Sequence, residues 1–122
     1  MNEPKKILVA EDDEIARELM CMTLKRQGYH VVTAEDGLKA YEFALILRPD
    51  LIITDVQMPS ADGAHFVRRV RDTEELAATP IIVTTGFGTG NATLTLSIGA
   101  DAYEPKPVNP ASLLETVRRL LT

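Results

Sequence analysis

The stretch DLIITD, residues 50–55, decides the fold of this chain. It is a short apolar run that is rich in isoleucine and ends on an aspartate. The runs KKILVA, residues 5–10, and PIIVTT, residues 80–85, share this pattern. Uninterrupted apolar runs of this length, rich in β-branched residues, are typical of strands that are buried on both faces of a parallel sheet.

Two further strands are predicted over 30–34 and 101–104. The second of these is weak, and we expect it at an edge of the sheet, ending early because of Pro105. Four segments have the helical spacing of apolar residues, namely 14–27, 38–47, 64–71 and a last helix that Asn109 caps. Strands that alternate with helices in this way predict an α/β fold, one doubly wound parallel sheet with helices on both faces.

Length and composition limit the class of protein. The 122 residues predict a single domain over 1–122, with its core at about 5–121. A net charge of −5 argues against a general nucleic-acid binder, and the lone Cys21 excludes an intramolecular disulfide. No apolar run approaches the ~18 residues of a membrane span. Residues 1–6 are polar and charged, with no apolar run followed by a small-residue cleavage site, so we do not expect a secretory signal. A soluble, cytoplasmic protein is therefore expected.

Chemically useful side chains follow the predicted strands. In such sheets the functional site lies beyond the carboxyl ends of the strands. The candidates there are Glu11, Asp12, Asp55, Thr84, Thr85 and Lys106. Clustered carboxylates suit Mg²⁺, and a carboxylate can act as a nucleophile on phosphorus while a lysine neutralises the transferring group. Asp13, next to the acidic pair, is predicted to cap the following helix instead.

At these positions the chain resembles the receiver domain of two-component response regulators, including chemotaxis regulators. The resemblance rests on ILVAEDD, DLIITDVQMPSADG, PIIVTTG and GADAYEPKPV, and it extends from about residue 5 to residue 121. Its most specific part is D-x-x-M-P-x-x-D-G over 55–63. The resemblance implies a flavodoxin-like, five-stranded sheet in the order 2-1-3-4-5.

The resemblance also implies a role for each site residue. Asp55 corresponds to the phosphoacceptor, and Lys106 would pair with the phosphoryl oxygens. Asp12 would bind Mg²⁺ directly and Glu11 would do so through water. The backbone carbonyl of Gln57 would complete the metal site.

The family mechanism further implies a switch and its partners. A sensor histidine kinase or a histidine phosphotransfer protein would supply the phosphoryl group, docking near the first helix. The new charge would draw in the hydroxyl of Thr85, and Tyr103 would follow inward. The surface around the fourth helix, fifth strand and fifth helix would then act on a protein target, without direct contact to nucleic acid or membrane. Such a protein assists its own phosphorylation and dephosphorylation but is not an enzyme with a separate substrate.

Some residues depart from the family pattern. Three glycines within 86–91 predict a short, late-starting or mobile fourth helix. Glu104 would add negative charge near Lys106 if its side chain points that way. The run Arg68, Arg69 and Arg71 predicts a basic, solvated outer face on the third helix.

Other functions are compatible with parts of the sequence. The main alternative is a pseudo-receiver, which would act as a phosphorylation-independent protein-interaction module. A phosphohydrolase that uses Asp55 as its nucleophile is disfavoured, because related folds have a second aspartate where Gln57 stands. Dinucleotide binding is disfavoured because Asn91 occupies the place of the third glycine in the fingerprint.

Overall fold

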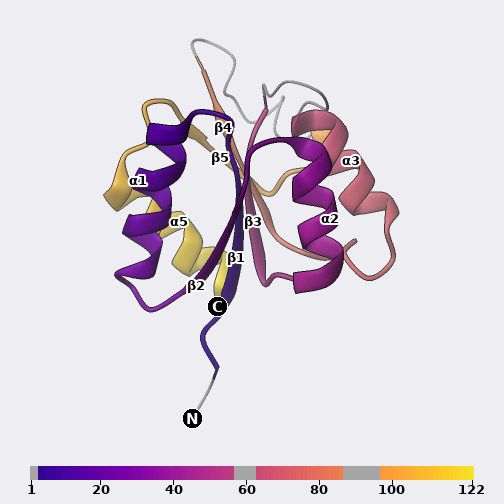
Figure 1. Ribbon diagram of the computed structural model, residues 1–122, viewed down its shortest axis with the longest axis horizontal. Helices are drawn as coiled ribbons and strands as arrows, with labels where there is room; N and C mark the ends of the chain where they lie inside the picture. The colour runs from indigo at the N-terminus through magenta and orange to yellow at the C-terminus, as the bar shows by residue number, and fades with distance from the viewer. Residues whose placement is uncertain (1–2, 57–62, 87–96) are drawn as a thin grey trace.

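The chain folds around one parallel sheet with the strand order β2-β1-β3-β4-β5, as the sequence predicts. The computed structural model describes residues 3–56, 63–86 and 97–122. The strands are β1 (Lys6–Ala10), β2 (His30–Ala34), β3 (Leu51–Asp55), β4 (Ile81–Thr85) and β5 (Ala102–Pro105). Because all strands run in the same direction, their carboxyl ends meet at one edge of the sheet, at the top of Figure 1.

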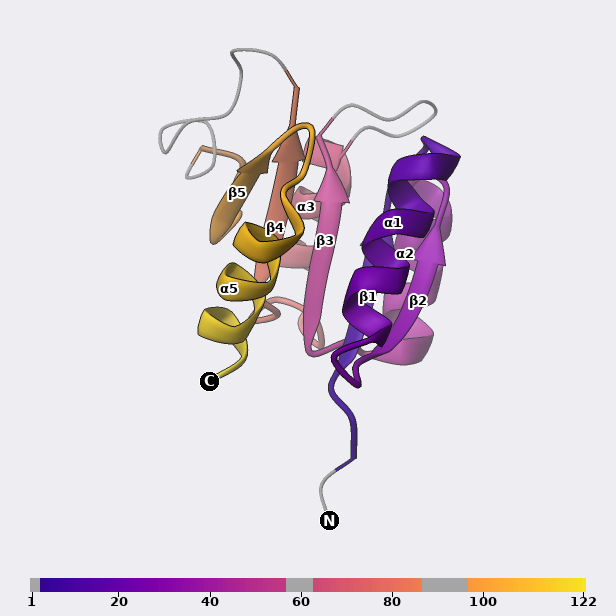
Figure 2. The ribbon, with the colours of Figure 1, turned by 90° about the vertical axis from the view of Figure 1, so that its left-hand side faces the viewer.

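Helices cover both faces of the sheet, which confirms the doubly wound α/β fold. In Figures 1 and 2, α1 (Glu14–Lys25) and α5 (Pro110–Leu121) lie against one face, and α2 (Gly37–Leu47) and α3 (Gly63–Asp72) lie against the other. None of the helices in the described part of the chain is both long and apolar enough to cross a membrane.

Two hydrophobic cores fill the space between the sheet and its helices. Successive strand residues point to opposite faces, so each buried strand supplies both cores. The first core, on the α2 and α3 side, contains Leu8, Ile52, Phe66 and Val83. The second, on the α1 and α5 side, is built from Ile7, Val9, Leu24, Leu51, Ile53, Ile82, Leu113 and Val117. The uninterrupted apolar sequence of β1 and β3 follows from this double burial.

Local sequence signals set where α1 and α5 begin. The side chain of Asp13 accepts a hydrogen bond from the backbone N–H of Ala16 at 2.8 Å, which confirms that it caps α1. Asn109 caps α5 through the N–H of Ser112 at 3.0 Å, and Pro110 occupies the first turn of that helix.

The fifth strand corrects one prediction. It lies at an edge of the sheet, as Pro105 requires, but it does not end before that residue. Pairing with β4 continues past the proline, because the backbone N–H of Lys106 donates to the carbonyl of Thr85 at 2.7 Å. The missing N–H of Pro105 therefore interrupts no pairing on the one side where β5 has a neighbour. The predicted irregularity of the fourth helix lies in 87–96, outside the described residues.

Arg71 corrects a second prediction, because its side chain is not a solvated charge on the outer face of α3. Its guanidinium donates to the carbonyls of Gly99, Ala77 and Thr79 at 2.9, 3.0 and 2.7 Å. It also forms an ion pair with Asp101 at 2.9 Å. Arg71 therefore ties α3 to the segments before β4 and β5, at the sheet edge opposite the carboxyl ends of the strands.

Candidate functional site

The predicted site residues meet at the carboxyl edge of the sheet. Glu11 and Asp12 directly follow β1, Asp55 is the last residue of β3, and Lys106 directly follows β5. Glu11 and Asp55 lie two residues beyond Val9 and Ile53, which face the α1 and α5 side. The period of two in a strand therefore directs both carboxylates to the same side of the sheet.

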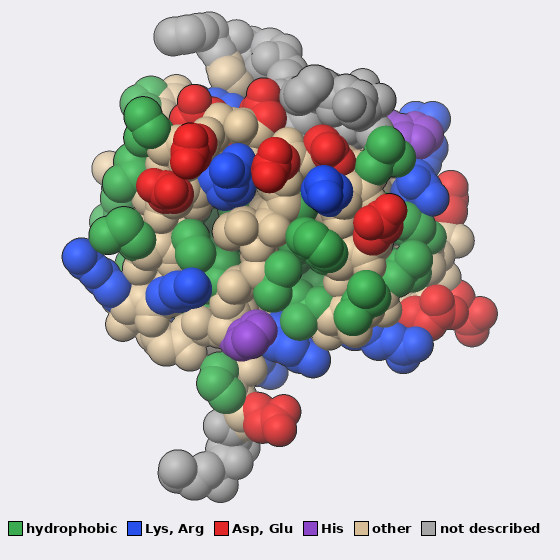
Figure 3. All heavy atoms as spheres, in the orientation of Figure 1, with side chains coloured by type: hydrophobic (Ala, Val, Ile, Leu, Met, Phe, Trp, Pro, Cys, Tyr) green, Lys and Arg blue, Asp and Glu red, His purple; other side chains and the backbone are tan. Residues whose placement is uncertain are grey.

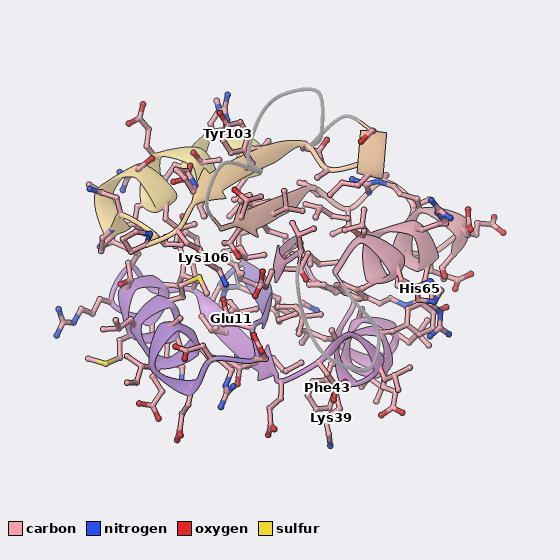
Figure 4. All side chains as sticks on the ribbon, turned by 90° about the horizontal axis from the view of Figure 1, so that it is seen from above. Glu11, Lys39, Phe43, His65, Tyr103 and Lys106 are labelled. Carbon is pink, nitrogen blue, oxygen red and sulfur yellow. The ribbon has the colours of Figure 1, made fainter. Side chains whose placement is uncertain are left out.

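The carboxylates and the lysine lie within contact distance of one another. One carboxylate oxygen from each of Glu11, Asp12 and Asp55 lies within 4.8 Å of the others. The Nζ of Lys106 donates a hydrogen bond to Asp55 Oδ2 at 2.7 Å and lies 3.2 Å from Glu11 Oε1. Figure 4 shows Lys106 and Glu11 side by side when the sheet edge is viewed from above. Glu11 and Asp55 are buried, whereas Asp12 is exposed.

The electrostatics of the site reflect this crowding. The pKa of Glu11 is raised to about 7, mainly by burial and also by the charge of Asp55, against the lowering effect of the hydrogen bond from the backbone N–H of Asp13. Burial lowers the pKa of Lys106, but its hydrogen bond to Asp55 and the charges of both carboxylates outweigh this effect, so the pKa is raised overall. The lysine thus stays protonated, while Glu11 holds a proton that a cation can displace.

The donor set fits a hard divalent cation. Three carboxylates in this part of the chain share one ammonium group, so negative charge remains in excess. Among the described residues, no group donates a hydrogen bond to Glu11 Oε1, since the contact with Lys106 is an ion pair without hydrogen-bond geometry. Carboxylate oxygens at this spacing are ligands that Mg²⁺ accepts. Gln57, whose carbonyl was predicted as a further ligand, lies outside the described residues.

The raised pKa of Glu11 predicts that Mg²⁺ affinity depends on pH. Below about pH 7 the ion must displace a proton from Glu11, so affinity should rise as the pH increases from 6 to 8 and then level off. One displaced proton gives about a tenfold change per pH unit below the pKa. Calorimetric titration with Mg²⁺ at several pH values measures this dependence.

The control for the pH dependence is Glu11→Gln, which has no proton to release in this range. It should bind Mg²⁺ more weakly, with an affinity that varies little between pH 6 and 8. An equally steep pH dependence in both proteins would contradict the assignment to Glu11.

The two threonines that end β4 are both buried, and among the described residues neither hydroxyl has a hydrogen-bond partner. Thr84 is paired in register with Asp55, so the two side chains lie on the same face of the sheet. Thr85 is on the opposite face, with Val83 of the first core. Buried hydroxyls without partners are uncommon and are able to take up a new acceptor. The choice of Thr85 over Thr84 as the switch residue stays a prediction.

The other two candidates on β5 lie away from the cluster. Tyr103 is half-buried against the first core, and Figure 4 shows it on the outer side of β5, apart from Lys106. Glu104 does not add charge beside Lys106. Its carboxylate is buried toward α5 and accepts a hydrogen bond from the hydroxyl of Thr116 at 2.9 Å.

Sequence reasoning missed an apolar groove beside the cluster. The groove has a volume of about 460 Å³ and lies between α1 and α5, lined by Ile15, Leu19, Val108 and Leu113. Glu11 and Lys106 line it as well, so the groove reaches the charged cluster. Ile15 and Leu19 are 71% and 59% exposed, and the helical spacing of apolar residues in 14–27 does not by itself show that these two face solvent.

Comparisons with known proteins establish the family. A family model described as the response regulator receiver domain matches residues 7–118, so the chain belongs to that family. The polar-differentiation response regulator DivK of Brucella anthropi is 31% identical over 119 residues, which are 97% of each chain. The chain spans about half the length of other curated response regulators that it matches.

Solved structures agree with this assignment. The chemotaxis response regulator CheY4 of Vibrio cholerae is 36% identical, with a TM-score of 0.89 over 97% of this chain and 99% of that one. The receiver domain of the sensor histidine kinase PA1611 from Pseudomonas aeruginosa PAO1 is 29% identical, with a TM-score of 0.89 over 97% and 98% of the two chains. That structure has a magnesium ion coordinated in its active-site cleft.

Proposed function

We propose that this receiver domain is a phosphoacceptor switch in which Asp55 takes a phosphoryl group from a phosphohistidine. The observation that carries the proposal is the position of the Asp55 carboxylate. It is buried at the end of β3, 2.7 Å from the Lys106 ammonium and next to two further carboxylates. A carboxylate placed beside a cation and a metal site is equipped to attack phosphorus and to stabilise the charge on the transferred group.

The transfer conserves charge and atoms. A carboxylate oxygen of Asp55 attacks the phosphorus in line, forming an O–P bond as the P–N bond to the donor imidazole breaks. The imidazole nitrogen retains the electron pair of the broken bond. Lys106, which pairs with Asp55 before transfer, is placed to pair with an oxygen of the acyl phosphate afterwards.

Glu11, Asp12 and Asp55 are the residues that would hold Mg²⁺. When bound, the ion neutralises negative charge on the phosphoryl oxygens. The magnesium ion in the receiver domain of PA1611 supports this assignment. In the metal-free protein below about pH 7, Glu11 is protonated and adds no negative charge to the site, so Lys106 is the group that pairs with Asp55.

The donor in this proposal is a histidine kinase or a histidine phosphotransfer protein that docks over α1. The apolar groove between α1 and α5 supports this site, because Glu11 and Lys106 are among its lining residues. A partner helix that covers Ile15 and Leu19 would bring its phosphohistidine to the carboxyl edge of the sheet. Figure 3 shows acidic side chains, interspersed with basic ones, gathered along the upper rim of the face that carries α1 and α2.

After transfer, the phosphoryl group adds about 1.5 to 2 negative charges at the sheet edge. In our proposal the Thr85 hydroxyl turns to this group and Tyr103 moves inward, which changes the surface of β5 and α5. The output is contact with another protein, without nucleic-acid or membrane binding by this domain. The domain assists only its own phosphorylation and dephosphorylation, and it acts in the cytoplasm.

Intact mass after incubation with a small acyl-phosphate donor tests the proposal. The protein is expected to gain one phosphoryl group in the presence of Mg²⁺. Asp55→Asn, and a sample treated with a chelator, should gain none. Asp50→Asn is a matched control, because Asp50 lies at the opposite end of β3, where it accepts from the backbone N–H of Lys6.

A phosphoryl group that is gained by Asp55→Asn as readily as by the unchanged protein would contradict the assignment of Asp55. No gain in a folded protein, together with no Mg²⁺ binding, would instead favour the pseudo-receiver. If Mg²⁺ binds without an adduct, a stable phosphoryl mimic is added. A shift in the resonances of Thr85 and Tyr103 then supports the switch, and unchanged resonances contradict it.

A further inference from the structure

Arg17 contacts every residue of the loop that joins β1 to α1. It lies four residues after Asp13, the helix cap, and its backbone N–H donates to the Asp13 carbonyl at 2.9 Å. Its side chain turns back along the helix. One guanidinium nitrogen, Nη1, donates to the carbonyl of Glu11 at 3.0 Å and, with a longer contact of 3.4 Å, to the carbonyl of Asp12.

These two carbonyls belong to the acidic pair. Pairing with β2 reaches the Glu11 N–H, which donates to the carbonyl of Ala34 at 3.0 Å, but Glu11 and Asp12 lie beyond the last residue of β1 and their carbonyls are the groups that Arg17 contacts. The Glu11 side chain is oriented by burial and by a hydrogen bond from the N–H of Asp13 at 3.1 Å. Asp12 is exposed, and the direction of its side chain depends on the backbone that Arg17 contacts.

We propose that Arg17 is a positioning residue for the metal site, which holds the backbone of Glu11 and Asp12 so that both carboxylates face Asp55. Groups that orient metal ligands without touching the metal commonly contribute 10- to 100-fold to affinity. The metal part of this inference rests on the proposed function. The effect of Arg17 on the loop does not, because the contacts are present in the metal-free protein.

Positioning and charge predict opposite results. Arg17 carries a positive charge near a cation site. If it acted through charge alone, its removal would strengthen Mg²⁺ binding, because one repulsive interaction would be lost. If it positions the loop, its removal weakens Mg²⁺ binding, because the two carboxylates lose their fixed orientation. The sign of the change therefore separates the two roles.

The test compares Arg17→Met with Arg26→Met in the complete chain. Arg26 is exposed at the other end of α1, so its replacement removes the same charge without touching the loop. Mg²⁺ affinity is measured by calorimetric titration at pH 8. Amide hydrogen exchange at Asp13 is measured in the metal-free protein, together with the global free energy of unfolding.

Arg17→Met is expected to bind Mg²⁺ roughly tenfold more weakly and to exchange the Asp13 amide faster, with Arg26→Met unchanged. Arg17→Lys, which keeps the charge and one possible donor, should recover part of both losses. It also serves as the test variant if Arg17→Met does not fold. Unchanged or stronger Mg²⁺ binding in Arg17→Met, or an equal loss in Arg26→Met, would overturn the proposal.

If the proposed function is wrong, Mg²⁺ binding and amide exchange at Asp13 give a different combination of results. If the unchanged protein itself binds no Mg²⁺, the metal site is wrong, and the exchange measurement decides the role of Arg17. Faster exchange at Asp13 in Arg17→Met then still supports positioning of the loop. Exchange equal to that of the unchanged protein contradicts it.

Discussion

Lys106→Met is expected to lower the free energy of unfolding of the metal-free protein at pH 8 by about 2–3 kcal/mol. The lysine forms ion pairs with both Glu11 and Asp55, whose side chains are 0% and 4% exposed. Removing one partner of a buried ion pair leaves its counterpart without compensation, at a typical cost of about 3–5 kcal/mol. The smaller value expected here reflects the 31% exposure of the lysine side chain.

The effect of this substitution should depend on pH and on metal. Glu11 has a pKa of about 7, so at pH 5.5 it is protonated and carries no charge that Lys106 must compensate. The loss should therefore be smaller at pH 5.5 than at pH 8, and Mg²⁺ at pH 8 should restore part of it. Urea unfolding under the three conditions measures these differences.

Lys39→Met is the matched control for Lys106→Met. Lys39 is exposed on α2, and its replacement changes the net charge by the same amount. A loss within about 0.5 kcal/mol is expected for such a surface position. If Lys39→Met were as destabilising as Lys106→Met, the effect would come from net charge rather than from the buried carboxylates.

Phe66→Ala is expected to lower the free energy of unfolding by about 3–5 kcal/mol. Phe66 lies on α3, is 1% exposed and packs in the first core with Leu8, Ile52 and Val83. Its replacement loses the transfer free energy of a phenyl ring and leaves a cavity that the surrounding side chains fill only in part. Denaturant unfolding, compared at constant m-value, measures the loss.

Two control variants test whether the loss in Phe66→Ala comes from the buried volume of this side chain. Phe66→Leu retains most of the volume and should lose clearly less than Phe66→Ala. Ile46→Ala removes a large apolar side chain from the neighbouring helix α2, but Ile46 is 83% exposed, so a change within about 0.5 kcal/mol is expected. Similar losses in Phe66→Ala and Ile46→Ala would contradict the assignment of the core.

The sequence predicts the sheet well because each inner strand is apolar on both faces. The runs at 5–10, 50–55 and 80–85 leave no polar face for a helix or an exposed strand, and caps such as Asp13 set where the helices begin. The bounds of β2 match the prediction, whereas β1, β3 and β4 each begin one residue later and β5 is shifted by one residue, because the bounds of a strand depend on its pairing partner. Pro105 shows this, since its place in β5 follows from which side of the strand faces β4.

The site was predictable where topology alone brings residues together. Asp55 and Lys106 are 51 positions apart, yet Asp55 ends β3 and Lys106 directly follows the parallel strand β5, so they meet at one edge. Contacts that depend on the direction of a side chain were not predictable. Glu104 turns to Thr116 instead of Lys106, and Arg71 binds backbone carbonyls instead of solvent. In neither case does the residue type or its spacing indicate which neighbours the tertiary structure provides.

The edge position of β5 has a mechanical consequence. Glu11 and Asp55 follow or end β1 and β3, which have a hydrogen-bonded neighbour on each side, whereas Lys106 follows a strand paired only with β4. Displacing an inner strand breaks two ladders, but displacing β5 breaks one. The carboxylates are therefore held by strands that resist displacement, whereas Lys106 follows the strand that is displaced most easily. When the charge at the carboxylates changes, we expect β5 and Lys106 to move rather than β1 and β3, and α5 contacts β5.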